Sequence, residues 1–410
     1  MKKYVIIGGG IAGVSCIEGI RSVDPDGEIT LISAEPESNY GRPLISDYLQ
    51  GKTDIPRMSW RGEDFFEVNH VDVRHAVTAE KLEPEAKKLI LSTGETLSYD
   101  ALCLCTGSYP FSPRFEGLET VPQRFFFTTL ADALALEQAV TKESRVLIVG
   151  AGFIGLKCAE GLRDRAGSVT VCDLAQHAMS ANLDADCAPI LEKHLEASGL
   201  RLMLGNTVTR FEGQTAHMQS GDIVDFDVLV IAIGTRPNVS LLADAGGAVN
   251  KGMLVGEGME TSLPGVWAAG DCTESMDVSA GAPGVLAVLP NASLQGRCAG
   301  INMAGGNEKF DKGIKMNSIG FFGLHIMSAG TYTEPVFTEL TDCGCKKLFA
   351  KDGVLTGFIL MGDVSRAGIY TSLIRERTPL ADIDFEAVKR EPSLLPFGPE
   401  YRVKKLGGAV

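Results

Sequence analysis

The chain begins with a short apolar run, a cluster of glycines and a second apolar stretch. Residues 4–7 (Tyr-Val-Ile-Ile) have the length and branched side chains of a buried β-strand, and the stretch from residue 11 to Ile20 has the character of a helix. A second strand is predicted at residues 29–32, just before Glu35. The turn between the first strand and the helix has the spacing Gly-x-Gly-x-x-Gly, at Gly8, Gly10 and Gly13. This order of elements is typical of a dinucleotide-binding βαβ unit.

The same order of elements occurs a second time. A strand is predicted at residues 146–149, a helix ends near Leu162, and another strand at residues 169–172 leads to Asp173. The glycines between this strand and helix are Gly150, Gly152 and Gly155. Glu35 lies 22 positions (35 − 13) after the last glycine of its set and Asp173 lies 18 (173 − 155) after its own, close to the ~20 of the known signature. One copy alone would fit a plain strand-to-helix turn equally well, but two complete copies predict two dinucleotide sites.

Each residue type in this signature has a physical reason. The first glycine permits a tight turn, the second lets a pyrophosphate approach the backbone, and the third lets the helix pack closely against the strand. The N-terminus of the helix offers free N–H groups to the phosphates, and the acid accepts hydrogen bonds from a ribose diol. Two dinucleotides in one chain predict electron transfer, with a flavin and a nicotinamide as the usual pair.

Composition narrows the class of protein. The 410 residues are 45% hydrophobic and 22% charged, which is ordinary for a globular protein of two or three domains. The net charge of −14 argues against nucleic acid as a partner, and no apolar run reaches the ~18 residues of a membrane helix. The ten cysteines include no Cys-x-x-Cys pair, and the first residues lead directly into a strand. These features predict a reduced, cytoplasmic protein without membrane insertion and without a metal site.

Five further segments carry a resemblance to a known family. They are residues 40–46 (Tyr-Gly-Arg-Pro-Leu-Ile-Ser), 105–108 (Cys-Thr-Gly-Ser), 231–238 (Ile-Ala-Ile-Gly-Thr-Arg-Pro-Asn), 261–271 (Thr-Ser-Leu-Pro-Gly-Val-Trp-Ala-Ala-Gly-Asp) and 289–297 (Leu-Pro-Asn-Ala-Ser-Leu-Gln-Gly-Arg). With them the chain resembles the FAD-dependent pyridine nucleotide-disulfide oxidoreductase superfamily, in particular its NADH:rubredoxin, ferredoxin and nitrite reductase branch.

The resemblance implies an α/β fold of the glutathione-reductase type, with two Rossmann-like dinucleotide-binding domains and a C-terminal α+β interface domain. We expect residues 1–111 and 235–314 to form a discontinuous FAD-binding domain, residues 112–234 the NAD(H)-binding domain, and residues 315–410 the interface domain. The implied FAD contacts are Gly8, Gly10, Gly13, Glu35, Arg42, Pro43, Thr106, Gly107, Gly270, Asp271 and Asn291. The implied NAD contacts are Gly150, Gly152, Phe153, Ile154, Gly155, Asp173 and Gly234.

The chain also departs from the family at informative positions. No cysteine occurs between Cys16 and Cys103, where disulfide reductases carry their redox cysteines, and the corresponding place falls at Pro43 or Leu44. Thiol–disulfide relay by that route is therefore excluded. Relatives often have lysine where this chain has Asp47, and glutamate where it has Lys157. Lys157, with Glu160 one turn later, is thus a candidate group near the nicotinamide, although no residue is singled out as catalytic.

The resemblance implies an NADH-dependent FAD flavoprotein reductase that passes electrons through FAD to a small iron–sulfur protein of the rubredoxin or ferredoxin type. Asp173, with no arginine following it, favours NADH over NADPH. Alternatives are an NADH oxidase that reduces oxygen to peroxide and a redox-sensing module that binds FAD and NADH. The oligomeric state stays open between monomer, homodimer and complex subunit, and the segment at residues 40–46 also resembles flavoproteins associated with carbon monoxide dehydrogenases.

Two smaller expectations concern the C-terminal part of the chain. A docking surface for an acidic iron–sulfur protein must be locally basic, and Lys346, Lys347, Arg375 and Arg377 are candidates for it. Cys343 and Cys345 could form a redox pair or half a metal site, but we interpret them as two free thiols, because no second Cys/His pair accompanies them.

Overall fold

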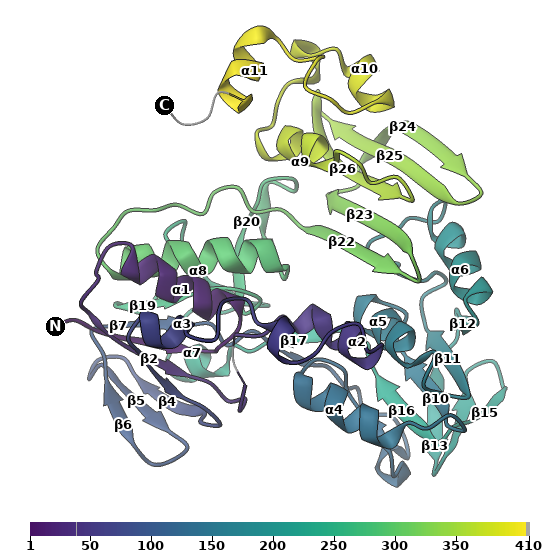
Figure 1. The fold of residues 1–410 in the computed structure, drawn as a ribbon, viewed down its shortest axis with the longest axis horizontal. Helices are drawn as coiled ribbons and strands as arrows, with labels where there is room; N and C mark the ends of the chain where they lie inside the picture. The colour runs from purple at the N-terminus through teal and green to yellow at the C-terminus, as the bar shows by residue number, and fades with distance from the viewer. Residues whose placement is uncertain (38, 407–410) are drawn as a thin grey trace.

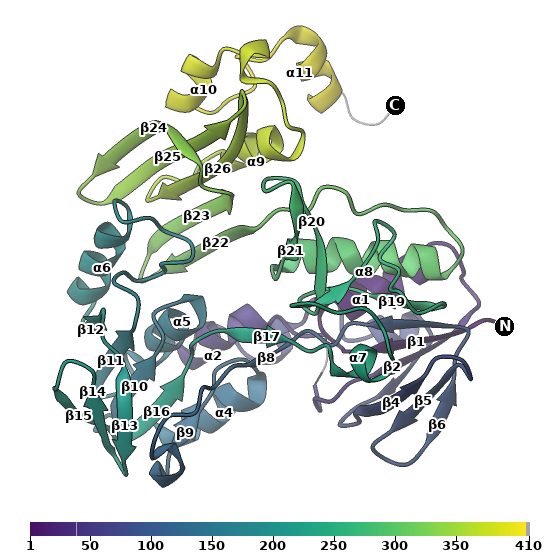
Figure 2. The ribbon, with the colours of Figure 1, turned by 180° about the vertical axis from the view of Figure 1, so that it is seen from behind.

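The computed structural model describes residues 1–37 and 39–406, and it contains three main sheets (Figures 1 and 2). The first is parallel, with strand order β19-β7-β1-β2-β3. Its strands are β1 (Lys3–Ile7), β2 (Glu28–Ile32), β3 (Val71–Arg74), β7 (Ala101–Leu104) and β19 (Val266–Ala268). Helices α1 (Ile11–Arg21) and α8 (Leu289–Met303) pack against it, and β19 brings a late segment of the chain back beside β7.

The second sheet repeats this arrangement, with strand order β12-β11-β10-β16-β9, again parallel. Its strands are β9 (Arg124–Phe125), β10 (Arg145–Val149), β11 (Ser168–Asp173), β12 (Arg201–Leu204) and β16 (Val228–Ile231). Its helices are α4 (Leu130–Ala139), α5 (Phe153–Leu162) and α6 (Ala188–Ala197). The four strands predicted around the two glycine turns are all present. Each begins one residue before its predicted start, and β11 also ends one residue after its predicted end.

Short elements connect and flank these two sheets. β8 (Ser108–Pro110) and β17 (Thr235–Pro237) pair antiparallel where the chain passes from one sheet to the other and returns. Two small antiparallel sheets are β4 (Ala79–Glu83) with β5 (Lys88–Leu91) and β6 (Thr96–Ser98), and β13 (Val208–Glu212) with β14 (Thr215–Met218) and β15 (Ile223–Asp225). The remaining elements are α2 (Ile45–Leu49), α3 (Phe65–Val68), α7 (Ser240–Asp244), β18 (Met253–Leu254), β20 (Thr273–Asp277) and β21 (Ala282–Val285).

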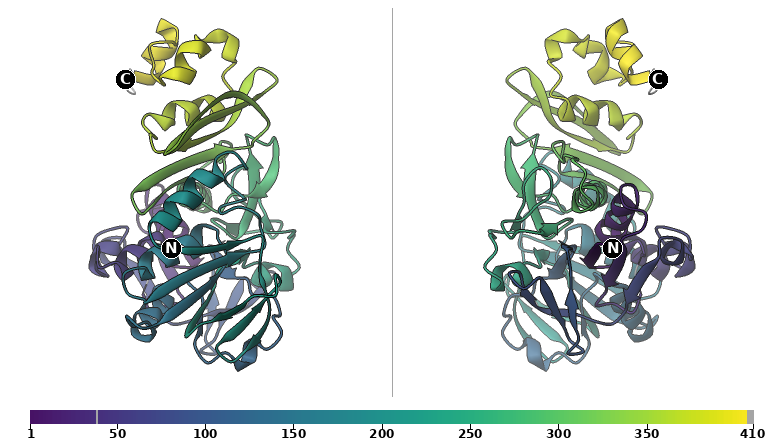
Figure 3. Two further views of the ribbon diagram at one scale, coloured as in Figure 1. Left: turned by 90° about the vertical axis from the view of Figure 1, so that its right-hand side faces the viewer. Right: turned by 90° about the vertical axis from the view of Figure 1, so that its left-hand side faces the viewer.

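The third sheet is antiparallel and forms a separate layer above the other two (Figure 3). Its order is β22-β23-β26-β25-β24, built from β22 (Met316–Phe321), β23 (Leu324–Gly330), β24 (Glu334–Thr341), β25 (Gly344–Lys351) and β26 (Val354–Met361). Helices α9 (Ala367–Arg375), α10 (Phe385–Arg390) and α11 (Pro399–Leu406) complete it. This is the mixed α/β architecture expected from the sequence. The domain limits at residues 111, 234 and 314 stay predictions. Among the described residues, no helix combines the length and apolar character that crossing a membrane requires.

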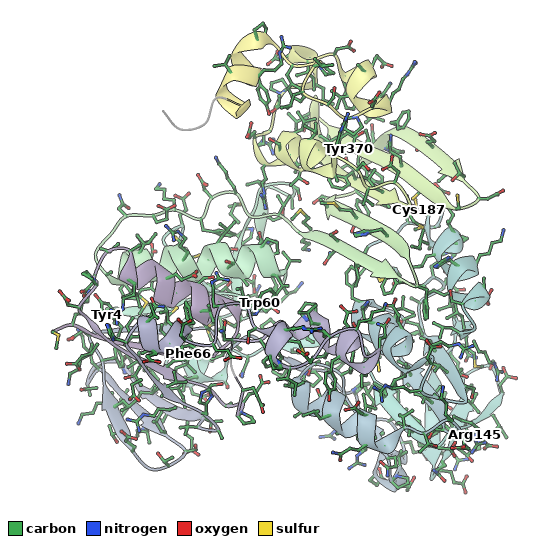
Figure 4. All side chains as sticks on the ribbon, in the orientation of Figure 1. Tyr4, Trp60, Phe66, Arg145, Cys187 and Tyr370 are labelled. Atoms are coloured by element: carbon green, nitrogen blue, oxygen red, sulfur yellow. The ribbon has the colours of Figure 1, made fainter. Side chains whose placement is uncertain are left out.

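Polar contacts hold the third sheet against the second. Lys347 on β25 is buried, and its Nζ lies 2.5 Å from carboxylate oxygens of both Asp184 and Asp186, which precede α6. The Tyr332 hydroxyl donates to the carbonyl of Asn182 in the same loop. Cys187, labelled in Figure 4, caps α6 at this junction. Lys347 is therefore buried in an ion-pair network inside the molecule, and the prediction that it belongs to a docking surface is wrong. Lys346 is partly buried and donates to the Arg390 carbonyl.

We expect Lys347→Met to destabilise the protein by about 3 kcal/mol, because it removes one member of a buried ion pair. Lys346→Met, at the neighbouring and only partly buried lysine, removes one hydrogen bond to a carbonyl and should change the unfolding free energy by less than about 1 kcal/mol. Urea unfolding at pH 7 measures both. Equal, small effects would show that the Lys347 ion pairs contribute nothing to stability.

The same ion pair should make stability depend on pH. Burial raises the pKa of the Asp184 carboxyl, but hydrogen bonds from Lys347 and the Cys187 N–H outweigh it, so the net pKa lies below its usual value. A depressed carboxyl pKa contributes stability above its unfolded pKa of about 4, and this contribution is lost as the pH falls through the folded value. Unfolding free energies measured from pH 7 to pH 3 should therefore fall less steeply in Lys347→Met than in the native chain.

Candidate functional site

The two glycine turns have the same geometry. Gly8 and Gly150 have φ of +112° and +118°, values that only glycine adopts without strain. A Cβ at Gly8 would collide with the carbonyl oxygen of Cys105, and one at Gly150 with that of Ala232. Each first glycine thus lets its turn lie against the end of the neighbouring strand, β7 or β16.

The third glycine of each set lets the helix pack directly against the turn that precedes it. The second glycine leaves open space in front of the helix N-terminus. A Cβ at Gly13 would overlap the carbonyl oxygen of Gly8, and one at Gly155 would overlap that of Gly150. By contrast, a Cβ at Gly10 or Gly152 would have no atom within 4 Å. Neither α1 nor α5 has a side-chain cap on its first turn. The backbone therefore presents an open cradle at two helix N-termini, which is the shape and polarity that a pyrophosphate needs.

Three of the expected FAD residues converge near the first cradle. Glu35, after β2, pairs with Arg42 and accepts a hydrogen bond from the Tyr40 hydroxyl. Burial raises the pKa of the Asp271 carboxyl, and the positive charge of Arg42 opposes this rise. Arg42 also donates to the Thr128 carbonyl, at 2.9 Å, while Pro43 beside it is exposed. Arg42 thus forms an ion pair with Glu35, and its positive charge also acts on Asp271.

Two buried amide oxygens near this region have no partner among the described residues. The Asn291 side chain donates from Nδ2 to the Ile314 carbonyl at 2.7 Å, which leaves its Oδ1 buried and unpaired in the first turn of α8. Asn39 likewise has a buried, unpaired Oδ1, and its backbone N–H donates to the carbonyl of Gly9 in the glycine turn. Unsatisfied buried acceptors are costly and point to a missing hydrogen-bond donor. The residues present therefore fit a bound FAD.

Sequence reasoning missed Asn39 and also the role of Gln295. The Gln295 Oε1 accepts the N–H of Gly270 at 2.8 Å and its Nε2 donates to Ser275, so it holds the turn that carries Asp271. Asn39 belongs to no sequence motif, so only the structure reveals it, through its unpaired Oδ1 and its positive φ of 64°. A signal did exist for the packing of α8 on α1. A Cβ at Gly296 would collide with the Ala12 carbonyl and one at Gly300 with that of Cys16, a Gly-x-x-x-Gly spacing visible in the sequence.

The carboxylate of Asp173 lies beside the second glycine turn and is oriented by two backbone hydrogen bonds. Its Oδ2 accepts the N–H of Ala151 at 2.7 Å, and its Oδ1 accepts the N–H of Ala175 at 2.8 Å. A carboxylate has about four acceptor positions, so two stay available for the hydroxyls of a ribose. Phe153 and Ile154 begin α5 and are partly exposed beside this turn.

Thr106, Gly107 and Gly234 lie at the passage between the two sheets. The Thr106 hydroxyl donates to the Asn238 carbonyl at 2.7 Å, and the Asn238 N–H donates to the Gly107 carbonyl at 2.9 Å. Gly107 and Gly234 have φ of +62° and +105°, and the Phe111 N–H donates to Gly234. These residues join the outgoing and returning strands β8 and β17 next to both cradles.

Lys157 and Glu160 pair with one another and with the third sheet. The Lys157 ammonium pairs with Glu160 and also donates to the Gly320 carbonyl at 3.3 Å. The other oxygen of Glu160 accepts the N–H of Phe322 at 2.7 Å, in the turn between β22 and β23. The charge of Lys157 is thus compensated by Glu160, and the pair connects α5 to the C-terminal sheet.

The cysteines in the described part of the chain are all free. Cys103 and Cys105 lie with their sulfurs 3.5 Å apart in the core of the first sheet. The hydrogen bond with Cys103 and burial raise the pKa of the Cys105 thiol. The hydrogen bond with Cys105 lowers the pKa of Cys103, but a hydrogen bond with Cys16 and burial outweigh it, so that pKa is also raised. Cys345 is buried, whereas Cys343 is exposed in the turn between β24 and β25. No thiol occurs in residues 40–47, where a relay cysteine would lie.

The two roles of glycine can be separated by mutation. Gly155→Ala should destabilise the protein by about 2 kcal/mol, because its Cβ overlaps backbone. Gly152→Ala should leave the melting temperature nearly unchanged but weaken NADH binding about tenfold, since its Cβ enters the open cradle. Thermal melts and NADH titrations test the pair. Unchanged NADH affinity in Gly152→Ala would show that the cradle does not receive the dinucleotide.

Comparisons with known proteins agree with this geometry. The model of the family described as pyridine nucleotide-disulphide oxidoreductase matches residues 2–296. The epsilon subunit of NADH-dependent phenylglyoxylate dehydrogenase from Aromatoleum evansii is 30% identical over 93% of both chains. NADH-rubredoxin oxidoreductase from Clostridium acetobutylicum is 24% identical over 88% of this chain and 92% of its own.

A solved structure shows the same fold. The crystal structure of the covalent putidaredoxin reductase–putidaredoxin complex superposes with a TM-score of 0.88 at 21% identity, covering 100% of this chain and 99% of that one. The match therefore includes the third sheet, which lies beyond the residues matched by the family model. The chain belongs to the pyridine nucleotide-disulphide oxidoreductase family and is an oxidoreductase that uses FAD and a nicotinamide dinucleotide.

Proposed function

We propose that this chain is an NADH-dependent flavoprotein reductase that passes electrons from NADH through FAD to a small iron–sulfur protein, without a redox-active disulfide. The observation that carries the proposal is the pair of equivalent cradles at Gly10 and Gly152. Residues 40–47 contain no cysteine that could relay electrons from the flavin to an external acceptor. Electrons must then leave from the flavin to an external acceptor.

Packing of the two sheets supports transfer between the two cradles. Helix α2 follows the Arg42–Leu44 turn beside the first cradle and packs against α5 of the second (Figure 1). The contact is close because Gly161 on α5 faces Leu49 and Ser46 on α2. One apolar core runs through this junction and includes Tyr40, Leu49 and Leu156. A rigid junction keeps two bound dinucleotides in one relative position, which is the main requirement of hydride transfer.

The roles of individual residues follow from this placement. Gly8, Gly10 and Gly13 with α1 hold the FAD pyrophosphate, Glu35 holds its ribose, and Asn39 and Asn291 offer their unpaired oxygens to it. Arg42 and Asp271 set the local charge. When bound, the flavin would accept two electrons from NADH and release them one at a time to an acceptor. The N-terminus of α8 at Asn291 adds a positive dipole end, which favours negative charge nearby.

The acceptor is proposed on chemical and comparative grounds. The name of the clostridial relative states rubredoxin as its acceptor, and the structurally similar reductase was crystallised with putidaredoxin. The relative from Aromatoleum is named as a subunit of a dehydrogenase, so this chain could also work within a complex. A rubredoxin or ferredoxin type of protein fits the clostridial relative and the structurally similar reductase, and we take it as the proposed partner.

The proposal is tested by anaerobic stopped-flow mixing of the FAD-loaded protein with NADH. Flavin reduction should be faster than about 10 s⁻¹, a typical turnover rate. Re-oxidation by rubredoxin or ferredoxin should then be faster than re-oxidation by oxygen. Rapid re-oxidation by oxygen alone would instead favour an NADH oxidase, and slow reduction by NADH would contradict a catalytic role and favour a redox sensor.

The preference for NADH is proposed from Asp173, whose charge opposes a 2′-phosphate. Leu174, the next residue, is 64% exposed, so a side chain there can change without disturbing the bonds of Asp173. Leu174→Arg should raise kcat/KM for NADPH about tenfold by balancing the carboxylate charge. Leu174→Gln, which adds length without charge, is the matched control. Equal use of both nucleotides by the native chain would refute the preference.

A further inference from the structure

A pocket in the C-terminal part of the molecule is not explained by either dinucleotide. It has a volume of about 380 Å³ and lies between α9 and the first two strands of the third sheet. One wall is a single stripe of α9, with Gly368, Thr371, Ser372 and Arg375 at helical spacing. The opposite wall holds the thioethers of Met316 on β22 and Met327 on β23, with Lys312 at the side.

Arg375 is the unusual member of this pocket. Its Nε is buried and has no hydrogen-bond partner, and no salt bridge to its guanidinium is formed by the residues that the structure describes. Burial lowers the pKa of the guanidinium. A partly buried cation without a counter-charge is costly unless a ligand supplies one.

The remaining charges in the pocket favour an anion. Glu376 is the one acidic lining residue, and its carboxylate accepts hydrogen bonds from Ser372 at 3.3 Å and from Tyr401 at 3.1 Å. Lys312 adds a second positive charge. Thr371 donates to the Ala367 carbonyl and contacts the Met316 sulfur, so the floor between the two cations is largely apolar.

Gly368 leaves room for the body of a ligand. A Cβ at this position would have no atom within 4 Å, so the helix face is open where other helices carry a side chain. On the opposite face of α9, Tyr370 is buried against Phe358 and donates to the Val388 carbonyl (Figure 4). The helix is therefore held in place by this contact on its other side, and the pocket lies between the helix and the edge of the sheet.

We propose that this pocket is a binding site for a carboxylate carried on a short apolar group. The guanidinium of Arg375 would receive the carboxylate, which is the pairing that arginine geometry favours, and the methionines would contact the apolar stem. The carboxylate could belong to a free small acid or to an acidic side chain of a bound protein, since both present the same chemistry. The site is independent of the proposed acceptor, because the pocket belongs to the C-terminal sheet and needs neither dinucleotide.

The segment beside the pocket is also linked by a hydrogen bond to α8 of the FAD region. The segment that leads from Lys312 to Met316 passes through Ile314, and the Ile314 carbonyl accepts the hydrogen bond from Asn291. A ligand bound on the outer side of this segment is thus separated from Asn291 by one stretch of backbone.

Ligand-observed NMR with the FAD-loaded protein tests the site, using butyrate as the probe and butyramide as its uncharged analogue. Butyrate should bind the native chain, and butyramide should bind at least about tenfold more weakly because it lacks the charge. Butyrate should also shift the Nε–H signal of Arg375, which a purely structural arginine would not show. Equal binding of the two probes would overturn the proposal.

Variants separate the site from its surroundings. Arg375→Gln should weaken butyrate binding about tenfold or more, and Gly368→Leu should do so by filling the pocket while favouring the helix. Arg366→Gln, which removes an equal charge at the other end of α9, is the matched control and should bind normally. NADH-dependent ferricyanide reduction should be unchanged in all three. Normal butyrate binding in both Arg375→Gln and Gly368→Leu would refute the site.

Kinetics with rubredoxin identify the source of the carboxylate. If it belongs to a bound protein, Arg375→Gln and Gly368→Leu should raise the KM for rubredoxin, and butyrate should compete with it. If it belongs to a free acid, the KM should stay constant while butyrate binding is lost. If neither rubredoxin nor ferredoxin accepts electrons, the proposed function is contradicted, while the butyrate result still decides the pocket.

Discussion

The close approach of backbone to backbone at two glycine turns is the constraint on which the rest of this molecule depends. Gly13 and Gly155 bring a helix within contact of the turn that precedes it, and Gly8 and Gly150 bring that turn against the end of a neighbouring strand. Only an absent Cβ permits these contacts. They direct the N-termini of α1 and α5 toward open space at the carboxyl ends of parallel strands, where ligands bind in sheets of this kind.

Polar contacts then decide how the third sheet sits on this frame. The Lys157–Glu160 pair, His194 and Lys347 all reach across the same junction, and His194 does so through the carbonyls of Phe321 and Phe322. Charged groups buried in such a junction are costly to separate, so they fix the relative position of α5 and the C-terminal sheet. A residue expected near the nicotinamide thereby also fixes the position of its helix.

Much of the fold could be predicted from local pattern. Apolar runs at residues 4–7 and 146–149 are the central strands, and the glycines after them mark the turns, because strand burial and turn conformation are local requirements. The burial of Lys347 could not be predicted from local pattern. Its burial follows from Asp184 and Asp186, which are more than 150 positions away, and exposed and buried lysines look alike in a sequence. The same reason hid Asn39 and Gln295, whose importance lies in distant backbone partners.

The amino-acid sequence by itself determined the number of dinucleotide cradles, the acid that accompanies each, and the absence of a cysteine relay at residues 40–47, because these depend on residue type and short spacing. The tertiary structure alone decided which groups meet. It paired Arg42 with Glu35, paired Lys157 with the C-terminal sheet, and left the buried Nε of Arg375 without a hydrogen-bond partner among the described residues. Such placements depend on contacts between segments far apart in the chain, and no local pattern encodes them.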